Sequence, residues 1–395
     1  MKQRSLFLKV IYSLLGLAII ALVLVFLLVP AKLEESMNRV IAHQAYSISQ
    51  QAKDLHKTLV IGDLHADSTL WKRNLLERSE RGHVDIPRMR EGNAAVQMFT
   101  SVTKVPDGIN YEKNSADASD RITMLQMVQL SPVATWSSLT ARALHHADKL
   151  KDIQNKAPEQ FQLLLTVNDL TSFLERRANG EAVVGGLLGT EGSHALDGKL
   201  ENINTLFDAG FRMMSLHHFF DNKLGGSLHG ESAAGLTEFG RQALAKMQSM
   251  NIMVDVSHSS EKAVEDVLAL SNKPLIVSHT GLYGHCKSKR NISDKLMQGI
   301  AAAGGLIGIG YWDAAVCDAT PASIVQAFRY GIDLLGEDHI ALGSDYDGAI
   351  EAPFDIAEIA ILTEEMLKAG FSETEIRKVM GGNMMRFLTE NLPSK

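Results

Sequence analysis

The sequence predicts an α/β fold, a (β/α)8 (TIM) barrel preceded by one transmembrane helix. Two observations predict the barrel. Short, almost continuously apolar runs recur along the chain, and helix-like segments lie between them. Such runs are typical of parallel strands that helices cover on both faces. Eight runs between residues 56 and 395 fit a single barrel, whose active-site groups lie at the carboxyl ends of the strands.

Residues 1–31 predict a membrane anchor. Lys2, Arg4 and Lys9 precede an uncharged run at 10–29, and about 20 apolar residues are enough to cross a bilayer as a helix. The basic flank orients the N-terminal side toward the cytoplasm, so the catalytic part is expected in the periplasm or outside the cell. A cleaved signal peptide is the alternative, although the run exceeds the usual signal core of about 7–15 residues.

The composition of the chain excludes some functions. The net charge of −7 provides no basic surface for nucleic acid. The sequence contains no glycine-rich nucleotide-binding loop, so a nucleotide cofactor is not indicated. Its two cysteines, Cys286 and Cys317, are compatible with one disulfide in an oxidising compartment or with two small buried residues.

The order of elements follows from the same patterns. Residues 32–55 are polar and are expected to form a linker with a short helix, and 56–395 form the barrel domain. The predicted strands are 58–62, 94–99, 182–188, 212–216, 252–256, 275–277, 306–309 and 340–343. Residues 109–162 are predicted to be a mostly helical insertion that forms a wall or lid over the site.

Metal-binding side chains follow the predicted strands. His65 and Asp67 follow the first strand, and residues i and i+2 of a strand point the same way, so both can reach one point. Comparable groups follow five of the other strands, namely Glu191, His218, His258, His279 and Asp345. Histidine nitrogens and carboxylates suit zinc, with manganese and cobalt as less specific alternatives. Three histidines and two carboxylates are enough for two metal ions that activate a water molecule for hydrolysis.

Four motifs at these positions are similar to those of a known family. They are His65-Ala66-Asp67, Gly189-Thr190-Glu191-Gly192, Val277-Ser278-His279 and Gly343-Ser344-Asp345-Tyr346-Asp347-Gly348. Together they resemble the membrane dipeptidase (renal dipeptidase) family of zinc peptidases, a group of metal-dependent amidohydrolase-like barrels. The resemblance extends from about Leu59 to Leu388.

The resemblance implies two zinc ions per subunit. His65 and Asp67 would bind one ion, His258 and His279 would bind the other, and Glu191 would bridge the two. Ligating histidines usually need a hydrogen-bond acceptor behind them, and the neighbouring Asp63 is a candidate for that role.

The resemblance also implies roles for three residues around the metal ions. His218 would stabilise the oxyanion, Arg290 would pair with the free carboxylate of the substrate, and Asp345 would orient the attacking water and carry its proton. A guanidinium suits the second role because it binds a carboxylate through two hydrogen bonds. His217 is expected to pack beside His218 without a role in the reaction.

The function that the resemblance implies is hydrolysis of dipeptides, including those with a D-residue at the C-terminal side. One alternative is another binuclear amidohydrolase that acts on a lactam, a lactone or a cyclic amide. Arg290 favours a substrate with a free carboxylate over such compounds. A second alternative is a membrane-tethered binding protein without activity. The sequence leaves the oligomeric state open, with a homodimer as one alternative.

Overall fold

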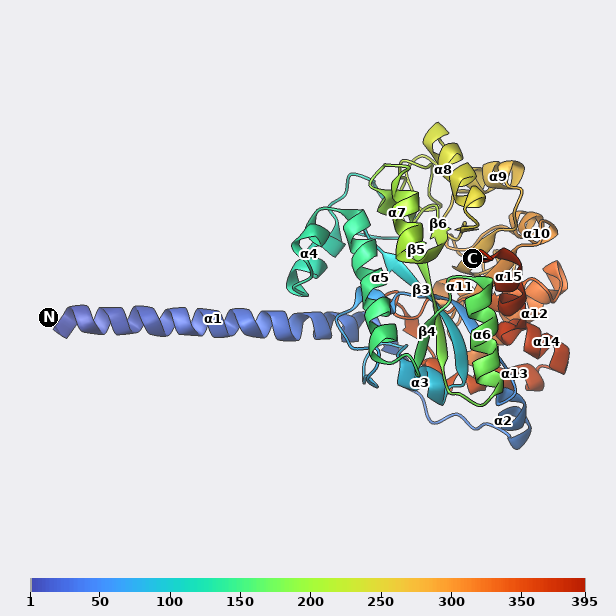
Figure 1. The fold of residues 1–395 in the computed structure, drawn as a ribbon, viewed down its shortest axis with the longest axis horizontal. Helices are drawn as coiled ribbons and strands as arrows, with labels where there is room; N and C mark the ends of the chain where they lie inside the picture. The colour runs from blue at the N-terminus through green and yellow to red at the C-terminus, as the bar shows by residue number, and fades with distance from the viewer. Residues whose placement is uncertain (1, 395) are drawn as a thin grey trace.

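The computed structural model describes residues 2–394 and confirms the barrel. Eight parallel strands pair in the order β3-β2-β10-β9-β8-β7-β6-β5, and a further pairing of β3 with β5 closes the ring (Figure 1). The strands are β2 (Ile61–Ala66), β3 (Ala94–Val102), β5 (Val184–Glu191), β6 (Phe211–Ser215), β7 (Met253–Asp255), β8 (Ile276–Thr280), β9 (Leu306–Ile309) and β10 (Ile340–Leu342).

Helices cover the outside of the ring (Figure 1). They are α2 (Gln50–His56), α3 (Ile86–Glu91), α4 (Arg121–Val128), α5 (Leu139–Lys156), α6 (Val167–Ala178), α7 (Asn202–Ala209), α8 (Glu238–Ser249), α9 (Glu261–Leu270), α10 (Asp294–Ala302), α11 (Asp313–Val316), α12 (Pro321–Leu335), α13 (Ala360–Lys368), α14 (Glu373–Arg377) and α15 (Asn383–Asn391).

Helix α9 illustrates why the helices form where they do. Ser260 precedes the helix, and its side chain accepts a hydrogen bond from the backbone N–H of Ala263, which the first turn would otherwise leave without a partner. Ala263, Val264 and Val267 lie on one face and are fully buried against the barrel, while Glu261 and its polar neighbours face solvent.

Each of the eight predicted strands is present, but the first is displaced. It was predicted at 58–62 and runs from Ile61 to Ala66, so His65 lies within the strand and not beyond its end. The prediction ended the strand at Gly62 because Asp63 and His65 are polar. These polar side chains are nevertheless buried, because they serve the site at the mouth of the barrel.

The interval 109–162 contains α4 and α5, as the helical patterns predicted. Its last residues form a strand that was not predicted, β4 (Phe161–Leu163), which pairs with the first residues of β5. Three residues are too few for a periodic pattern to reveal a strand.

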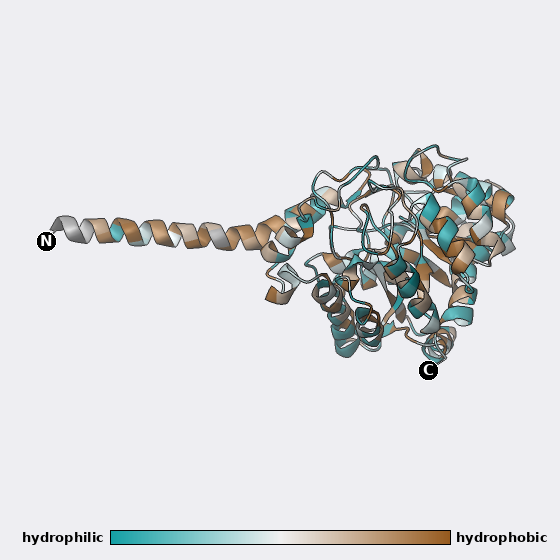
Figure 2. Ribbon diagram, turned by 90° about the horizontal axis from the view of Figure 1, so that it is seen from above, coloured by the Kyte–Doolittle hydropathy of each residue, from teal (hydrophilic) through white to brown (hydrophobic). Residues whose placement is uncertain are grey.

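Helix α1 (Lys2–Met37) projects from the barrel as one long apolar helix (Figures 1 and 2). The segment Phe7–Met37 is long and apolar enough to cross a membrane; an 18-residue window within it has a mean hydropathy of 3.0, and little of that window is buried. Directly after it, β1 (Arg39–Val40) pairs with β11 (Glu351–Ala352) in the loop that follows β10. The chain is therefore bonded to the barrel as soon as α1 ends.

The two cysteines form a disulfide, Cys286–Cys317, which joins the segment after β8 to the end of α11. This decides between the two alternatives that the sequence left open. Disulfides persist mainly in oxidising compartments.

Candidate metal centre and active site

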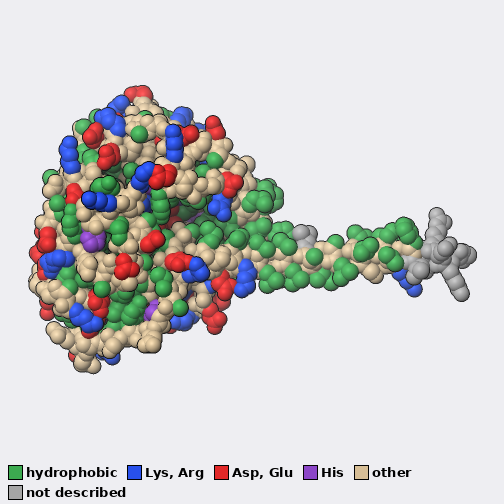
Figure 3. Space-filling model, turned by 180° about the vertical axis from the view of Figure 1, so that it is seen from behind, with side chains coloured by type: hydrophobic (Ala, Val, Ile, Leu, Met, Phe, Trp, Pro, Cys, Tyr) green, Lys and Arg blue, Asp and Glu red, His purple; other side chains and the backbone are tan. Residues whose placement is uncertain are grey.

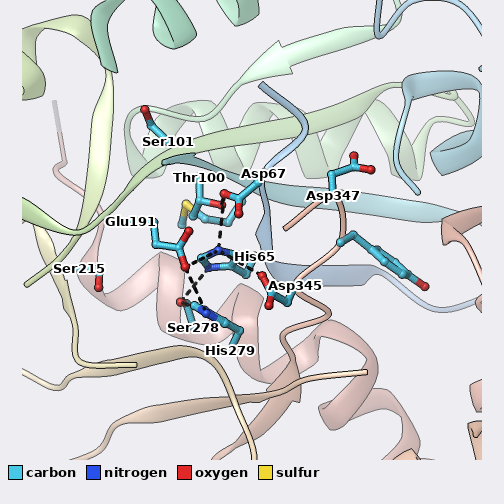
Figure 4. Close-up of polar contacts among 12 residues, drawn as sticks. His65, Asp67, Thr100, Ser101, Glu191, Ser215, Ser278, His279, Asp345 and Asp347 are labelled. Atoms are coloured by element: carbon cyan, nitrogen blue, oxygen red, sulfur yellow. Dashed lines mark hydrogen bonds and ion pairs between the residues drawn. The ribbon is translucent and has the colours of Figure 1, made fainter. Parts of the chain in front are cut away.

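The predicted metal-binding residues converge at one end of the barrel, at the carboxyl ends of its strands. His65 and His279 lie within β2 and β8, and Glu191 is the last residue of β5. Figure 4 shows these three side chains and those of Asp67 and Asp345 pointing toward one another. The complete group, all buried, is His65, Asp67, Glu191, His218, His258, His279 and Asp345.

Glu191 lies at the centre of this group. Its Oε1 atom is 3.1 Å from Nε2 of His258 and 3.3 Å from Nε2 of His279. The same oxygen is 3.4 Å from Nε2 of His218 and 3.7 Å from Nε2 of His65. One carboxylate oxygen therefore faces four imidazole nitrogens that come from four different segments of the barrel.

The spacing of these atoms fits divalent metal ions better than it fits hydrogen bonds. His65 Nε2 is buried without a hydrogen-bond partner, yet it lies 3.7 Å from Asp67 Oδ1 and 3.8 Å from Asp345 Oδ1. Two ligand atoms that are each about 2.1 Å from a tetrahedral zinc ion lie roughly 3.4 Å apart. Imidazole nitrogens and carboxylate oxygens are also the ligands that catalytic zinc prefers.

The ligand atoms fall into two sets that share Glu191, and within each set all atoms lie within 4.8 Å of one another. The first set adds His65, His279 and Asp345, and the second adds His218 and His258. A shared carboxylate agrees with the expected bridge. The remaining division differs from the expected one, which joined His258 to His279 and kept Asp345 and His218 free of metal. The individual roles of these residues stay predictions.

Burial and neighbouring charges shift the pKa values of the three carboxyl groups. It raises the pKa of Asp345 well above its usual range, and the nearby charge of Glu191 adds to this rise. Burial together with Glu191 raises the pKa of Asp67 to about 6. For Glu191 the histidines, His218 foremost, outweigh burial and hold the pKa well below its usual range. Since ligands bind metal in their deprotonated form, a bound cation would displace the proton that burial favours on Asp345.

Ser278 orients two of the imidazoles. Its hydroxyl donates to Asp255 Oδ2 at 2.8 Å, and it lies 3.0 Å from Nδ1 of both His65 and His279. A hydroxyl that donates to Asp255 can only accept from these rings, so both carry their proton on Nδ1. In the neutral form of each ring, Nε2 is then unprotonated and faces Glu191, as metal ligation requires.

Asp63 does not have the contact expected of it. Its carboxylate accepts hydrogen bonds from the backbone N–H of His65 and of Ser344 and from the side chain of Gln97, but it does not touch an imidazole. Asp63 thus supports the site through the backbone of His65, while Ser278 and Asp255 occupy the position behind the imidazoles. Asp63 instead ties β2 to the segment that leads from β10 to Asp345.

The other histidines near the barrel mouth belong to neither ligand set. The Nδ1 atom of His217 lies 2.9 Å from the hydroxyl of Ser259, and burial lowers the pKa of His217 to about 4. This agrees with the expected packing role. His194 packs against Phe220, and His229 stacks on Phe219.

Arg290 is buried beside the histidines. One of its nitrogens, Nη2, donates to the backbone oxygen of His279 at 2.8 Å, and Nη1 donates to the backbone oxygen of Ser257 at 2.9 Å. Its guanidinium carbon lies 5.5 Å from the centre of the Trp312 ring. The backbone contacts fix the guanidinium at the edge of the cavity described next.

A cavity of about 740 Å³ opens over the group. It is lined by Asp67, Glu191, His218, His258, Arg290 and Asp345. Tyr111 of the insertion and Trp312 also line it, and the Trp312 indole donates to the Tyr111 hydroxyl. The insertion therefore forms a wall, as expected, although neither aromatic residue was singled out from the sequence.

The comparisons with known proteins agree with this site. The sequence model of the membrane dipeptidase family (peptidase family M19) matches residues 49–393. This chain belongs to that family. Among curated relatives, mouse (Mus musculus) dipeptidase 3 is 24% identical in an alignment of length 371 that covers 86% of this chain and 66% of that protein. The chain thus spans slightly less than two thirds of its relative.

Solved structures of metallopeptidases share the fold. Dipeptidase AC, a metallopeptidase of family M19, is 25% identical, with a TM-score of 0.68 over 86% of this chain and 100% of that one. A metallopeptidase from Rhodobacter sphaeroides, bound to a phosphinate mimic of L-Ala-D-Ala, is 24% identical. Its TM-score is also 0.68, over 85% of this chain and 99% of that one.

Replacing Ser278 tests the support of the metal centre. The Ser278→Ala variant removes the acceptor behind His65 and His279, so we expect zinc affinity to fall by about 10- to 100-fold. Competition with a calibrated chelator measures this affinity. Ser101→Ala is the matched control, because Ser101 is an equally buried barrel serine that contacts His146 and no ligand. Equal affinities in the two variants would contradict the role of Ser278.

Proposed function

We propose that this chain is a zinc-dependent dipeptidase that binds two zinc ions per subunit. The observation that carries the proposal is the position of Glu191, whose Oε1 atom lies within 3.7 Å of the Nε2 atoms of four histidines. Membership of a metallopeptidase family supports the same conclusion. Bound zinc would lower the pKa of a coordinated water and polarise the carbonyl of the scissile amide.

The residues around the ions carry the remaining chemistry. Asp345 follows β10 at the floor of the cavity, and its raised pKa suits a group that takes a proton from water and gives it to the leaving amine. His218 lines the same cavity and would donate a hydrogen bond to the oxygen on which negative charge develops. The side chains of Trp312 and Tyr111 line the cavity and would exclude bulk water from the reacting atoms.

Arg290 would select substrates with a free carboxylate. Its guanidinium lines the cavity, and its Nη2 atom lies 3.3 Å from Nε2 of His258, so a fixed positive charge stands directly beside the metal ligands. A positive charge this close to the metal centre suits a short substrate such as a dipeptide, whose terminal carboxylate lies near the scissile amide. The Rhodobacter sphaeroides relative binds a mimic of L-Ala-D-Ala, so we include L-D dipeptides among the proposed substrates.

We further propose that α1 is an uncleaved membrane anchor and that residues 56–395 form a catalytic domain outside the cytoplasm. The length and hydropathy of Phe7–Met37 support the anchor. The basic residues before the apolar run and the disulfide Cys286–Cys317 support the location.

Hydrolysis by the full-length chain, purified in detergent, tests the proposed function. We expect release of free amino acids from a panel of L-L and L-D dipeptides, loss of this activity with a chelator and its recovery with zinc. Elemental analysis is expected to find two zinc ions per chain. Glu191→Ala, which lacks the shared ligand, is the inactive control. If the zinc-loaded wild-type chain cleaved none of the dipeptides, the proposal would be wrong.

Arg290 offers a sharper test of substrate class. Because a hydrogen bond to a charged group contributes about 1.5–3 kcal/mol, Arg290→Ala should raise KM for dipeptides by about 10- to 100-fold. Dipeptide amides lack the terminal carboxylate, so their kinetic constants should change little between the two proteins. Zinc content is measured in parallel. An equal loss on acids and amides would show that Arg290 supports the fold or the metal centre and does not bind the carboxylate.

A further inference from the structure

Helix α1 does not end at the surface of the barrel but continues into the wall of the active-site cavity. Val29, Leu33 and Met37 line this cavity together with Asp67 and Glu191. The three α1 residues are four positions apart, so they lie on one face of the helix. The mouth of the cavity therefore lies beside the point where the apolar helix leaves the body.

Helix α4 lies next to this point and carries an apolar surface of its own. Ile122 and Leu125 pack inward, against a cluster that includes Met37 of α1. In α4 and in the segment directly after it, the side chains of Met124, Leu130 and Val133 are 68%, 59% and 70% exposed, and Met124 also lines the cavity. These three residues are called the α4 patch below. Large exposed apolar side chains that occur within ten residues of one another are candidates for contact with a partner.

We propose that the α4 patch inserts into the same bilayer leaflet that α1 enters, so that the active site opens at the membrane surface. The apolar surface of α1 supplies the argument for a bilayer as the partner. Leu27 and Leu28, 64% and 55% exposed, lie just before the residues that line the cavity. In Figure 3 the hydrophobic side chains of the helix continue onto the adjoining part of the body.

The consequence concerns how substrates arrive. A cavity walled by Leu33 of α1 and by α4, with a mouth at the level of the lipid headgroups, receives peptides that collect at the membrane surface. The inference rests on the proposed anchoring through α1, and its test separates the two.

Fluorescence quenching in nanodiscs tests the α4 patch in the full-length chain. The two natural cysteines are joined in a disulfide, so a single introduced cysteine can be labelled with an environment-sensitive fluorophore. The labelled variants are Met124→Cys, Leu130→Cys, Val133→Cys, Leu17→Cys within α1, and Leu270→Cys at the end of α9 as an exposed apolar control. The quencher is phosphatidylcholine with brominated acyl chains.

We expect brominated lipid to quench the labels of the α4 patch and of Leu17→Cys and to leave that of Leu270→Cys unchanged. Quenching at Leu17→Cys without quenching at the three patch positions would overturn the inference and leave the anchor intact. Cross-linking between copies in place of quenching would also overturn it, because a second copy would then cover the patch. Absence of quenching at Leu17→Cys would overturn the anchor itself.

A separate observation concerns Glu34, near the end of α1. Its side chain is 1% exposed. Its carboxylate oxygens lie 2.7 Å from Nε of Arg73 and 2.7 Å from Nε of Arg81. Arg73 also forms an ion pair with Asp347, two residues beyond Asp345. A buried chain of charges thus connects the end of the apolar helix to the loop that carries Asp345.

That loop has an unusual backbone. Asp345, Asp347 and Ala349 have φ values of 62°, 61° and 63°, in the left-handed region that residues other than glycine seldom adopt. Such a conformation persists only where surrounding contacts impose it. Besides the ion pair of Arg73, the side chain of Asn38 accepts a hydrogen bond from the N–H of Ala349. Asn38, the first residue after α1, supplies one of these contacts, and Arg73, which pairs with Glu34 of α1, supplies the other.

We infer that Glu34 is a positioning residue for Asp345, an inference that rests on the proposed catalytic role of Asp345. Glu34→Gln in the full-length chain should lower kcat for dipeptides, with KM and zinc content close to those of the wild-type chain. Glu34→Asp, which keeps the charge, should recover part of the loss. Glu35→Gln is the matched control, because the neighbouring Glu35 pairs with Lys32 at the surface and its side chain is 57% exposed.

A drop in Tm with unchanged kcat would overturn this inference, because it would show a structural role alone. Unchanged kcat and Tm would overturn it as well. An inactive wild-type chain would instead contradict the proposed function.

Discussion

The site depends on one arrangement, a single carboxylate surrounded by imidazoles in a buried place. Glu191 faces nitrogens from four segments of the ring, and the side chains of the group are almost fully buried. Burial of so many polar groups without matching hydrogen bonds is costly, as the unpartnered Nε2 of His65 shows. Divalent cations at this position would compensate that cost. The geometry of the barrel mouth is therefore best understood as that of a metal centre.

A barrel suits this task because its strands deliver side chains from distant parts of the sequence to one mouth. The ligands alone would not be enough, since each ring must also carry its proton on the correct nitrogen. Ser278 and Asp255 provide this for two histidines, and Asp63 fixes the backbone of β2 against the segment after β10. Buried polar residues behind the site thus do as much for the chemistry as the ligands do.

The segment that joins the anchor to the barrel contacts the active site more closely than a simple tether would require. The proposed linker at 32–55 includes Asn38, which holds the loop of Asp345, and β1, which pairs with β11 beyond that loop. Leu33 and Met37 of α1 line the cavity. The segment that joins the anchor to the barrel is therefore part of the active-site structure, and a fragment that begins after it would lack part of the cavity wall.

The sequence by itself predicted the barrel, its eight strands and the residues that meet at its mouth. Apolar periodicity and polar residues at strand ends are local signals, and His65, Glu191 and His279 each carry one. The sequence could not give the contacts behind the site. Asp63 and Asp255 are both acidic residues at a strand, and only the closed barrel decides which of them contacts the ligating imidazoles through Ser278.

Nor could the sequence place α1 at the cavity, because an apolar run has the same pattern whether or not its last turns touch the barrel. Glu34 looked like a flanking charge, and its burial between two arginines follows from packing between segments about 40 residues apart. The types of side chain at the strand ends, and the chemistry that they can carry out, could be predicted from the order of residues. The partners of each group were decided only when the ring closed and brought its segments together.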